Sequence, residues 1–382
     1  MRYLLALALV PASAFADVSV GASIGAGAQG RTAYSALDLR FDAAWPDITP
    51  ETPEIRLGLG ARGVWDDSTF RTSDWASPWH AITIVRDFEA RYDLDDTELA
   101  LAAGALAPAQ LSHIVNGYRV ALDDRWRTGV RTAAQNEDLT ASLELDDVLD
   151  PALAAGGVRW FMAPPWGAHL ALAVDPRAPA MAGPQTPVAI EAGLDHRLQA
   201  EDAELAIGAA VVAELTLGAS LVAFGEGAID WHGVRWTGRA DVRVGTGTNG
   251  AMFGPLYRIE RLAHDGAEST WDRARAGELS GAGAGIALGA AIPFGWLELG
   301  ARARPGIGPL FTINGGAPMG RWVQAGVWGA IGERDAAGAA EVRIAWAKTL
   351  FSALQAARVY RLDDMDPRAV WSLTAWFGAT TE

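Results

Sequence analysis

The chain has 382 residues, of which 50% are hydrophobic and only 9% aromatic, and its 31 basic and 46 acidic residues give a net charge of −15. This acidity argues against a nucleic-acid partner, whose phosphates would be repelled, and against electrostatic docking on anionic lipid. There is no cysteine, so disulfides cannot stabilise the fold. The 43 glycines favour apolar faces that meet fluid lipid over a close-packed core of large side chains.

The N-terminus has the pattern of a cleaved signal peptide. Arg2 supplies a positive start, residues 3–10 are apolar, and Ala14-Phe15-Ala16 forms an A-x-A cleavage site. We therefore expect residues 1–16 to be removed on export and residues 17–382 to form a single barrel domain.

Residues 234–244 change polarity at nearly every position. One face carries Val234, Trp236, Ala240, Val242 and Val244, and the other carries Arg235, Thr237, Arg239, Asp241 and Arg243. A period of two predicts a strand, and at a tilt of about 45° its length of roughly 36 Å spans the apolar band of a membrane barrel. The charged face cannot meet lipid, so it must meet water or paired charges.

The same alternation recurs along the chain. Before this strand it predicts strands at residues 17–28, 34–43, 54–63, 81–92, 97–106, 127–134, 139–148, 158–163, 168–174, 188–198 and 201–213. After it the predicted strands are residues 281–292, 296–304, 321–331, 340–347, 354–362 and 369–377. The apolar run 205–224 contains Glu214 between two glycines, which predicts two strands rather than a membrane helix. The fold class is all-β: a membrane-spanning antiparallel up-and-down barrel of about 16 strands, range roughly 14 to 18.

Connections between these strands differ in length. Short turns at residues 93–96 and 332–338 contrast with long Pro/Gly-rich links at residues 45–53, 65–79, 175–187 and 245–277. Outer-membrane barrels have such an asymmetry, with short periplasmic turns and long outer loops. In the last link Ser269 precedes Asp272 at capping-box spacing, which predicts a helix start. This link either folds into the lumen as a constriction or forms a surface loop, and the surface loop is the simpler interpretation.

Sixteen tryptophans are present, and many lie near predicted strand ends: Trp231, Trp271, Trp296, Trp322, Trp346 and Trp371. Indole rings are favoured at the level of lipid headgroups, because one edge is apolar and the other can bond to water. The set therefore indicates aromatic girdles at the membrane interfaces.

The signal peptide, the alternating strands and the ending Val370-Trp-Ser-Leu-Thr-Ala-Trp-Phe377 resemble a Gram-negative outer-membrane β-barrel of the porin-like kind. This resemblance implies an outer-membrane location, contact with its lipid, and recognition of Trp371, Leu373 and Phe377 by the barrel assembly machinery. Residues 378–382 depart from the family pattern, since many members stop at the final aromatic residue. The oligomeric state is left open, a homo-oligomer included.

If the apolar faces point outward, a set of charged residues lines the lumen. These candidates are Arg40, Arg56, Arg62, Asp146, Arg235, Arg239, Asp241, Arg243, Glu298, Arg302, Arg304 and Arg343. Arginine stays protonated at any working pH, so such rows produce a fixed field across a wet pore. The alternative is that arginines and carboxylates pair across neighbouring strands and fill the lumen. The net acidity favours cations, and the luminal arginines weaken that preference.

No catalytic residue, cofactor or metal site is expected. The stretch Ser112-His113 with Asn116-Gly117 is similar to one in outer-membrane phospholipases, but Val115 occupies the position of their serine nucleophile. The six histidines are scattered, with no spacing suited to zinc. Paired aspartates at residues 95–96, 123–124 and 146–147 are typical of solvated acidic turns rather than calcium sites.

These observations predict an outer-membrane porin-like channel, not an enzyme, for passive diffusion of small hydrophilic solutes or ions through a charged lumen. One alternative is a plugged structural or adhesive surface barrel whose long loops bind a partner. Another is a secreted or periplasmic β-sandwich, in which the apolar faces are buried against each other. Strand length opposes the sandwich, whose strands usually have about five or six residues, because several predicted strands are longer.

Overall fold

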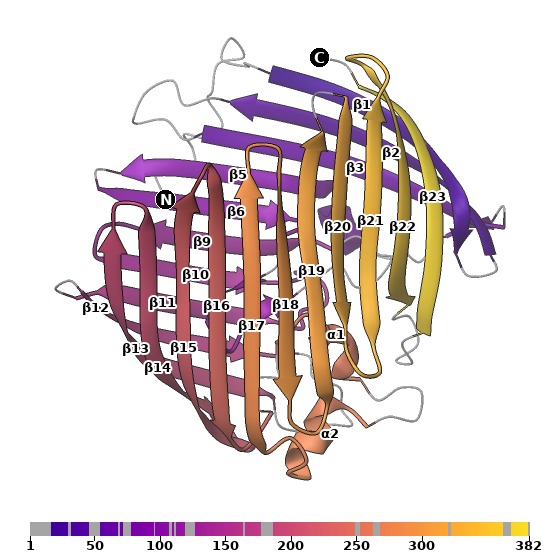
Figure 1. Cartoon of the computed structure of the whole chain (residues 1–382). Helices are drawn as coiled ribbons and strands as arrows, with labels where there is room; N and C mark the ends of the chain where they lie inside the picture. Colours follow the sequence, from indigo (N-terminus) through magenta and orange to yellow (C-terminus); the bar gives the residue numbers. More distant parts are fainter. Residues whose placement is uncertain are drawn as a thin grey trace.

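The computed structural model describes residues 17–29, 32–45, 54–67, 69–71, 78–94, 96–106, 109–110, 112–118, 127–162, 165–176, 186–248, 253–262, 268–319, 322–361 and 368–380. They form one antiparallel sheet of 21 strands and a separate pair, β7 (Ala109–Gln110) and β8 (Asn116–Tyr118). In the sheet, the short β4 (Thr69–Phe70) pairs only with β3, so 20 strands remain in the main ring. Each ring strand pairs with the next one along the chain, and β23 pairs back to β1 (Figure 1).

The first ten ring strands are β1 (Asp17–Gln29), β2 (Thr32–Trp45), β3 (Glu54–Asp66), β5 (Val85–Leu94), β6 (Thr97–Gly104), β9 (Gly129–Gln135), β10 (Leu139–Leu145), β11 (Ala154–Phe161), β12 (Trp166–Val174) and β13 (Val188–Ala200). The other ten are β14 (Ala203–Glu214), β15 (Gly218–Trp231), β16 (Val234–Gly245), β17 (Gly281–Ile292), β18 (Gly295–Arg304), β19 (Gly308–Met319), β20 (Val323–Ile331), β21 (Ala336–Ala345), β22 (Leu350–Arg361) and β23 (Arg368–Thr380). The predicted closed antiparallel barrel is confirmed, and its apolar faces are not buried against a second sheet as in a sandwich.

The predicted strand number is wrong: the ring has 20 strands rather than about 16, and it lies outside the predicted range. One strand absent from the prediction is β19, whose Pro309, Pro318 and paired glycines at 315–316 have the composition of a turn. Pro318 pairs with Gln324 of β20 but lies beyond Gly316, the last β19 residue paired with β18. Because β18 does not pair with β19 at Pro318, the missing amide hydrogen of the proline removes no hydrogen bond to β18.

Alternate side chains of the ring strands face outward and inward. In β16, Val242 and Val244 are more than half exposed, whereas Arg243 between them is 2% exposed. In β2, Leu37, Leu39 and Phe41 are exposed in the same way. An isolated barrel that exposes apolar side chains at every second position has an outer surface suited to hydrocarbon.

The connections differ between the two ends of the barrel. The strands joined by the long links 67–84, 105–128, 175–187 and 246–280 meet these links at one end, and the opposite end carries turns such as 201–202, 232–233 and 293–294. The long-link end is at the bottom of Figure 1, where the two α-helices lie. Two predicted connections are placed differently: β2 ends at Trp45 and β3 begins at Glu54 at the short-turn end, and the 332–335 turn lies at the long-link end. We call these the long-loop end and the short-turn end.

The helices within the described residues are few and short. They are a 3₁₀ helix (Pro78–Ile84), α1 (Tyr257–Glu260) and α2 (Thr270–Arg275). Ser269 is the N-cap of α2, and its hydroxyl accepts a hydrogen bond from the Asp272 amide at 3.1 Å, which confirms the predicted helix start. Within the described ranges, no helix has the length and apolarity needed to cross a membrane.

Most exposed tryptophans of the described residues lie at the short-turn end, whereas Trp79 and Trp371 lie toward the long-loop end. Those at the short-turn end are Trp160, Trp166, Trp231, Trp236, Trp296, Trp322 and Trp346, each at or near the end of a ring strand or in the adjoining turn. This arrangement agrees with an aromatic girdle at one membrane interface. Trp271 was predicted in the same group but is buried in α2, where it packs with apolar residues inside the mouth of the barrel.

Candidate functional site

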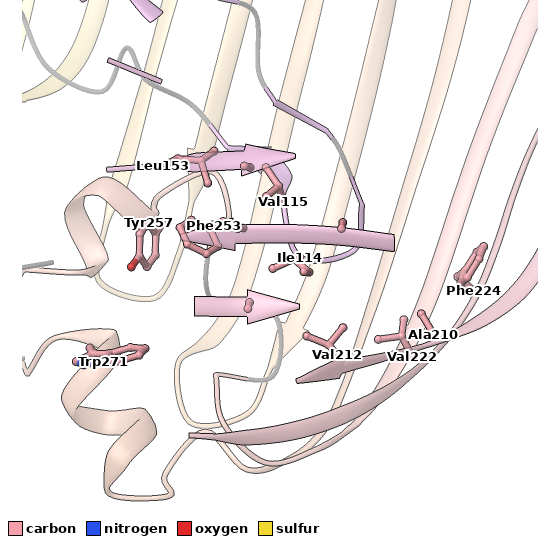
Figure 2. Packing of buried hydrophobic residues seen from close by; sticks show 14 residues of the cluster. Ile114, Val115, Leu153, Ala210, Val212, Val222, Phe224, Phe253, Tyr257 and Trp271 are labelled. Atoms are coloured by element: carbon pink, nitrogen blue, oxygen red, sulfur yellow. The ribbon is translucent and has the colours of Figure 1, made fainter. Parts of the chain in front are cut away.

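The candidate site is the barrel lumen, and part of one long link enters it. Residues 112–118, called here the inward segment, lie against the inner faces of β12 to β16. Ile114 and Val115 are buried in one apolar cluster with wall residues such as Val212 and Phe224 (Figure 2). Arg243 of β16 donates a hydrogen bond to the His113 carbonyl oxygen at 2.6 Å. The inward segment is therefore held by both apolar packing and a charged donor from the wall.

A second segment, residues 253–262 with α1, fills the mouth at the long-loop end and is called here the mouth segment. Phe253 and Tyr257 pack in the cluster that holds the inward segment (Figure 2). Leu256 and Ile259 pack instead with a second wall cluster that includes Tyr360 of β22. The mouth segment thus touches two parts of the wall, and the predicted surface loop is wrong for these residues.

Three arginine–carboxylate pairs fasten the mouth segment. Arg258 donates to Asp146 at 3.0 Å, and Arg261 donates to both oxygens of Asp175 at 2.9 Å. In the opposite sense, Arg304 of β18 donates to Glu260 at 2.9 Å. All of these side chains are at most 9% exposed. Removing one partner of a buried pair leaves an uncompensated charge, which typically costs about 3 to 5 kcal/mol.

The predicted lumen residues divide between two sides of the barrel and its mouth. Arg235, Arg239, Asp241, Glu298 and Arg302 line one cavity, and Arg40, Arg62 and Arg343 line another formed by β1, β2, β3 and β21 to β23. Arg243 lies beneath the inward segment. Asp146 and Arg304 bind the mouth segment. Arg56 pairs with Glu54 near the short-turn end of β3 and is exposed.

On the side of the barrel that Arg239 and Arg302 line, ion pairs reach across an intervening strand. Arg302 of β18 donates to Asp241 of β16 at 2.7 Å, although β17 lies between them. Gly285 of β17 makes this contact feasible, because a Cβ there would lie 2.8 Å from the Asp241 oxygen and 2.9 Å from the Arg302 guanidinium. The charged network therefore depends on a position without a side chain. The start of β17 is rich in glycine, so this part of the strand carries few side-chain atoms.

Three cavities on this side share their boundaries. Their volumes are about 1230, 1140 and 1030 Å³ including the open mouths, and Arg239 lines all three. Asn116 of the inward segment lines the first two, so this segment lies between them. Arg239 approaches Glu298 at 3.5 Å and keeps 27% of its side chain exposed. It is the arginine placed to meet any solute that passes between the cavities.

The structure also assembles a group that the sequence did not predict. His113 of the inward segment, His169 of β12 and Glu191 of β13 have ligand atoms within 4.8 Å of one another. Strand alternation places His169 and Glu191 on the polar faces of their strands, a signal that was present in the sequence. His113 comes from a link without periodicity, so no local spacing could connect it to the other two.

Comparisons with known proteins find only distant structural likenesses. No protein-family model and no curated protein matches the chain. The outer membrane protein opdK from Pseudomonas aeruginosa aligns over 96% of this chain and 99% of its own, with 11% identity and a TM-score of 0.40. A BenF-like porin from Pseudomonas fluorescens Pf-5 aligns over 96% and 100%, with 10% identity and a TM-score of 0.38. Pseudomonas aeruginosa OccK2 (OpdF), solved with glucuronate, aligns over 96% and 98%, with 9% identity and a TM-score of 0.39. Likenesses this low carry no conclusion about a solute.

Proposed function

We propose that this protein is a porin-like channel of the outer membrane, through which small hydrophilic solutes or ions diffuse passively. The observation that carries the proposal is the combination of an apolar outer face with polar, solvent-accessible cavities on the inner face of a closed barrel. A protein that only needed to fill its barrel would bury these inner charges throughout. The proposal assigns transport and no catalytic step.

The passage is expected to be narrow and weakly selective. The inward and mouth segments occupy part of the cross-section, which limits the size of a solute. Arg239 faces Glu298, and Arg40 faces Asp42, so positive and negative groups alternate along the inner wall. The fields of such opposed charges act on ions but cancel over a short distance. The passage should therefore admit small polar solutes without strongly preferring cations or anions.

Export and assembly are parts of the same proposal. Residues 1–16, the predicted signal peptide, lie outside the described residues. Trp371, Leu373 and Phe377 lie on the outer face of β23 and are each more than half exposed. Their exposure supports recognition by the barrel assembly machinery.

Planar-bilayer recording tests the channel. The detergent-extracted protein, shown to be folded and inserted, should give discrete conductance steps with a measurable reversal potential in a salt gradient. Silence from folded, inserted protein would reject the channel.

The mouth segment favours one other function. Its buried ion pairs close part of the long-loop end, as a plugged structural or adhesive barrel would require. In that case the conductance would be absent, and removing the mouth segment's ion pairs would create it. The same bilayer experiment therefore separates the two functions.

A further inference from the structure

A buried carboxylate and two imidazoles meet where the inward segment touches the wall. His113 Nδ1 and His169 Nε2 each lie 2.8 Å from the same oxygen, Oε1 of Glu191. The Ile114 amide donates to Oε2, the other oxygen, at 3.0 Å. Glu191 is completely buried, and the two imidazoles keep 19% and 12% of their side chains exposed. The group thus joins three separate parts of the chain at one point.

The charge of Glu191 is balanced differently from that of most buried acids in this protein. Glu144, Asp146, Asp175 and Asp195 all pair with arginine. Over the ranges that the structure describes, the partners of Glu191 are imidazoles and backbone amides, with no arginine or lysine among them. A buried carboxylate is costly without a neutralising positive charge. A bound cation would supply that charge.

The wall is shaped to admit the His169 ring. Gly193 of β13 is its neighbour across the sheet, and a Cβ at Gly193 would lie 2.4 Å from Cε1 and 2.7 Å from Nε2 of that ring. Phe224 covers the group from the other side, with its ring centroid 4.2 Å from that of His113. The imidazoles are therefore packed in place and directed at Glu191.

The ligand set matches a known type of metal coordination. Two imidazole nitrogens and one carboxylate oxygen form a three-ligand zinc site with a fourth position open to water. With metal–ligand bonds of about 2.1 Å, tetrahedral geometry places ligand atoms roughly 3.4 Å apart. To reach this spacing, the two 2.8 Å contacts open slightly and the two imidazole nitrogens, which lie within 4.8 Å of each other, come closer. The adjoining cavity, which these three residues line, supplies water.

We propose that His113, His169 and Glu191 bind one divalent transition-metal ion of the zinc class, which ties the inward segment to the barrel wall. The ion bridges β12, β13 and the inward segment, so it acts as a removable cross-link inside the lumen. Binding does not require that the barrel conduct.

Zinc binding to the folded protein in detergent tests the site directly. After EDTA treatment and desalting, the protein is titrated with zinc alone, and the bound metal is measured by mass spectrometry and calorimetry. We expect one zinc ion per chain, and at least tenfold weaker binding in both His113→Ala and Glu191→Gln. His113 lies outside the ring of strands, so its substitution leaves the wall intact.

The matched control is His232→Asn. His232 lies in the β15–β16 turn with φ of 52°, a left-handed conformation that asparagine tolerates, so the variant should fold and bind zinc as the parent does. Absence of zinc binding by the parent protein would overturn the proposal. Unchanged affinity in both His113→Ala and Glu191→Gln would overturn it as well.

One consequence rests on the proposed channel function. Zinc should lower the parent's single-channel conductance by fixing the inward segment, and EDTA should restore it, whereas His113→Ala should not respond. Zinc binding by protein that never conducts would keep the metal site and reject the channel. Conductance without zinc binding would do the reverse, so the two proposals fail separately.

Discussion

The two sides of the lumen treat their charges differently. On the side covered by the inward and mouth segments, Arg243 and Arg258 keep at most 2% of their side chains exposed, and their partners Asp241 and Asp146 keep only 10% and 0%. On the opposite side, Arg40 and Arg56 keep more than half of their side chains exposed and pair with carboxylates two residues away on the same strand. We call these the covered wall and the open wall.

This difference separates two roles for one pattern of residues. Alternation alone puts charged side chains inside the barrel on both walls. On the covered wall, buried charges hold segments of the chain in place, and a buried pair is expensive to break. On the open wall, exposed pairs contribute little to stability and leave their field available to a solute. Substitutions on the two walls should therefore affect different properties.

The largest effect is expected from Arg258→Ala. It removes the Arg258 guanidinium from the fully buried Asp146, which should cost about 3 to 5 kcal/mol in the docking of the mouth segment. The mouth segment should then become sensitive to protease, and the single-channel conductance should rise. The exposed pair of the open wall provides the control, because Arg56→Ala should change neither property. Equal protease resistance of Arg258→Ala and the parent would remove the distinction between the walls.

A smaller effect is expected from Arg243→Met. This change keeps a long side chain but removes the donor to the His113 carbonyl oxygen and the pair with Asp241. Loss of the buried charged contact should loosen the inward segment and raise the single-channel conductance severalfold. Arg343→Met on the open wall is the matched variant, and its conductance should stay close to that of the parent. A larger increase in single-channel conductance in Arg343→Met than in Arg243→Met would contradict the difference between the two walls.

Next in size is Gly285→Ala. The added Cβ enters the space between Asp241 and Arg302, and such overpacking typically costs about 1 to 3 kcal/mol. The chain offers a matched control in Gly326→Ala on β20, where a Cβ would meet nothing within 4 Å. Urea unfolding in detergent should show a lower midpoint for Gly285→Ala alone. Equal midpoints would mean that the Arg302 pair contributes no stability.

The smallest effect on stability is expected from Arg40→Gln. Because this arginine is exposed, losing its pair with Asp42 should change the free energy of unfolding by at most about 1 kcal/mol. The lumen of the open wall becomes more negative, so the reversal potential in a salt gradient should shift toward cation preference. An unchanged reversal potential would show that ions do not pass this wall.

Much of the barrel could be predicted because membrane strands must alternate in polarity. Val242, Arg243 and Val244 show the pattern within three residues. The predicted strands missed β19, where Pro309 and Pro318 lie near strand ends and look like turn residues in the sequence. The amino-acid composition cannot show that a proline lies where its strand has no hydrogen-bonded neighbour on one side.

The sequence predicted which face of a strand lines the lumen, but not which luminal residues lie together in a site. Period two identified Arg239, Asp241 and Arg243 together, yet only Arg243 is buried, because the inward segment covers it. That segment has no periodicity, and it is held by contacts more than 70 residues apart in the chain, such as His113 with Glu191. Long-range contacts of this kind leave no local signal, so neither the covered wall nor the histidine group could be predicted.

The most direct test of the two walls uses the absence of cysteine from the chain. Ser23 lines the cavity of the open wall, and Ser220 is buried on β15 of the covered wall, so Ser23→Cys and Ser220→Cys each introduce a single thiol of similar size. A charged, membrane-impermeant thiol reagent is added while the single-channel conductance is recorded. We expect Ser23→Cys to react rapidly and lose conductance, and Ser220→Cys to stay protected. Equally fast reaction at both positions would contradict a lumen divided into a covered and an open wall.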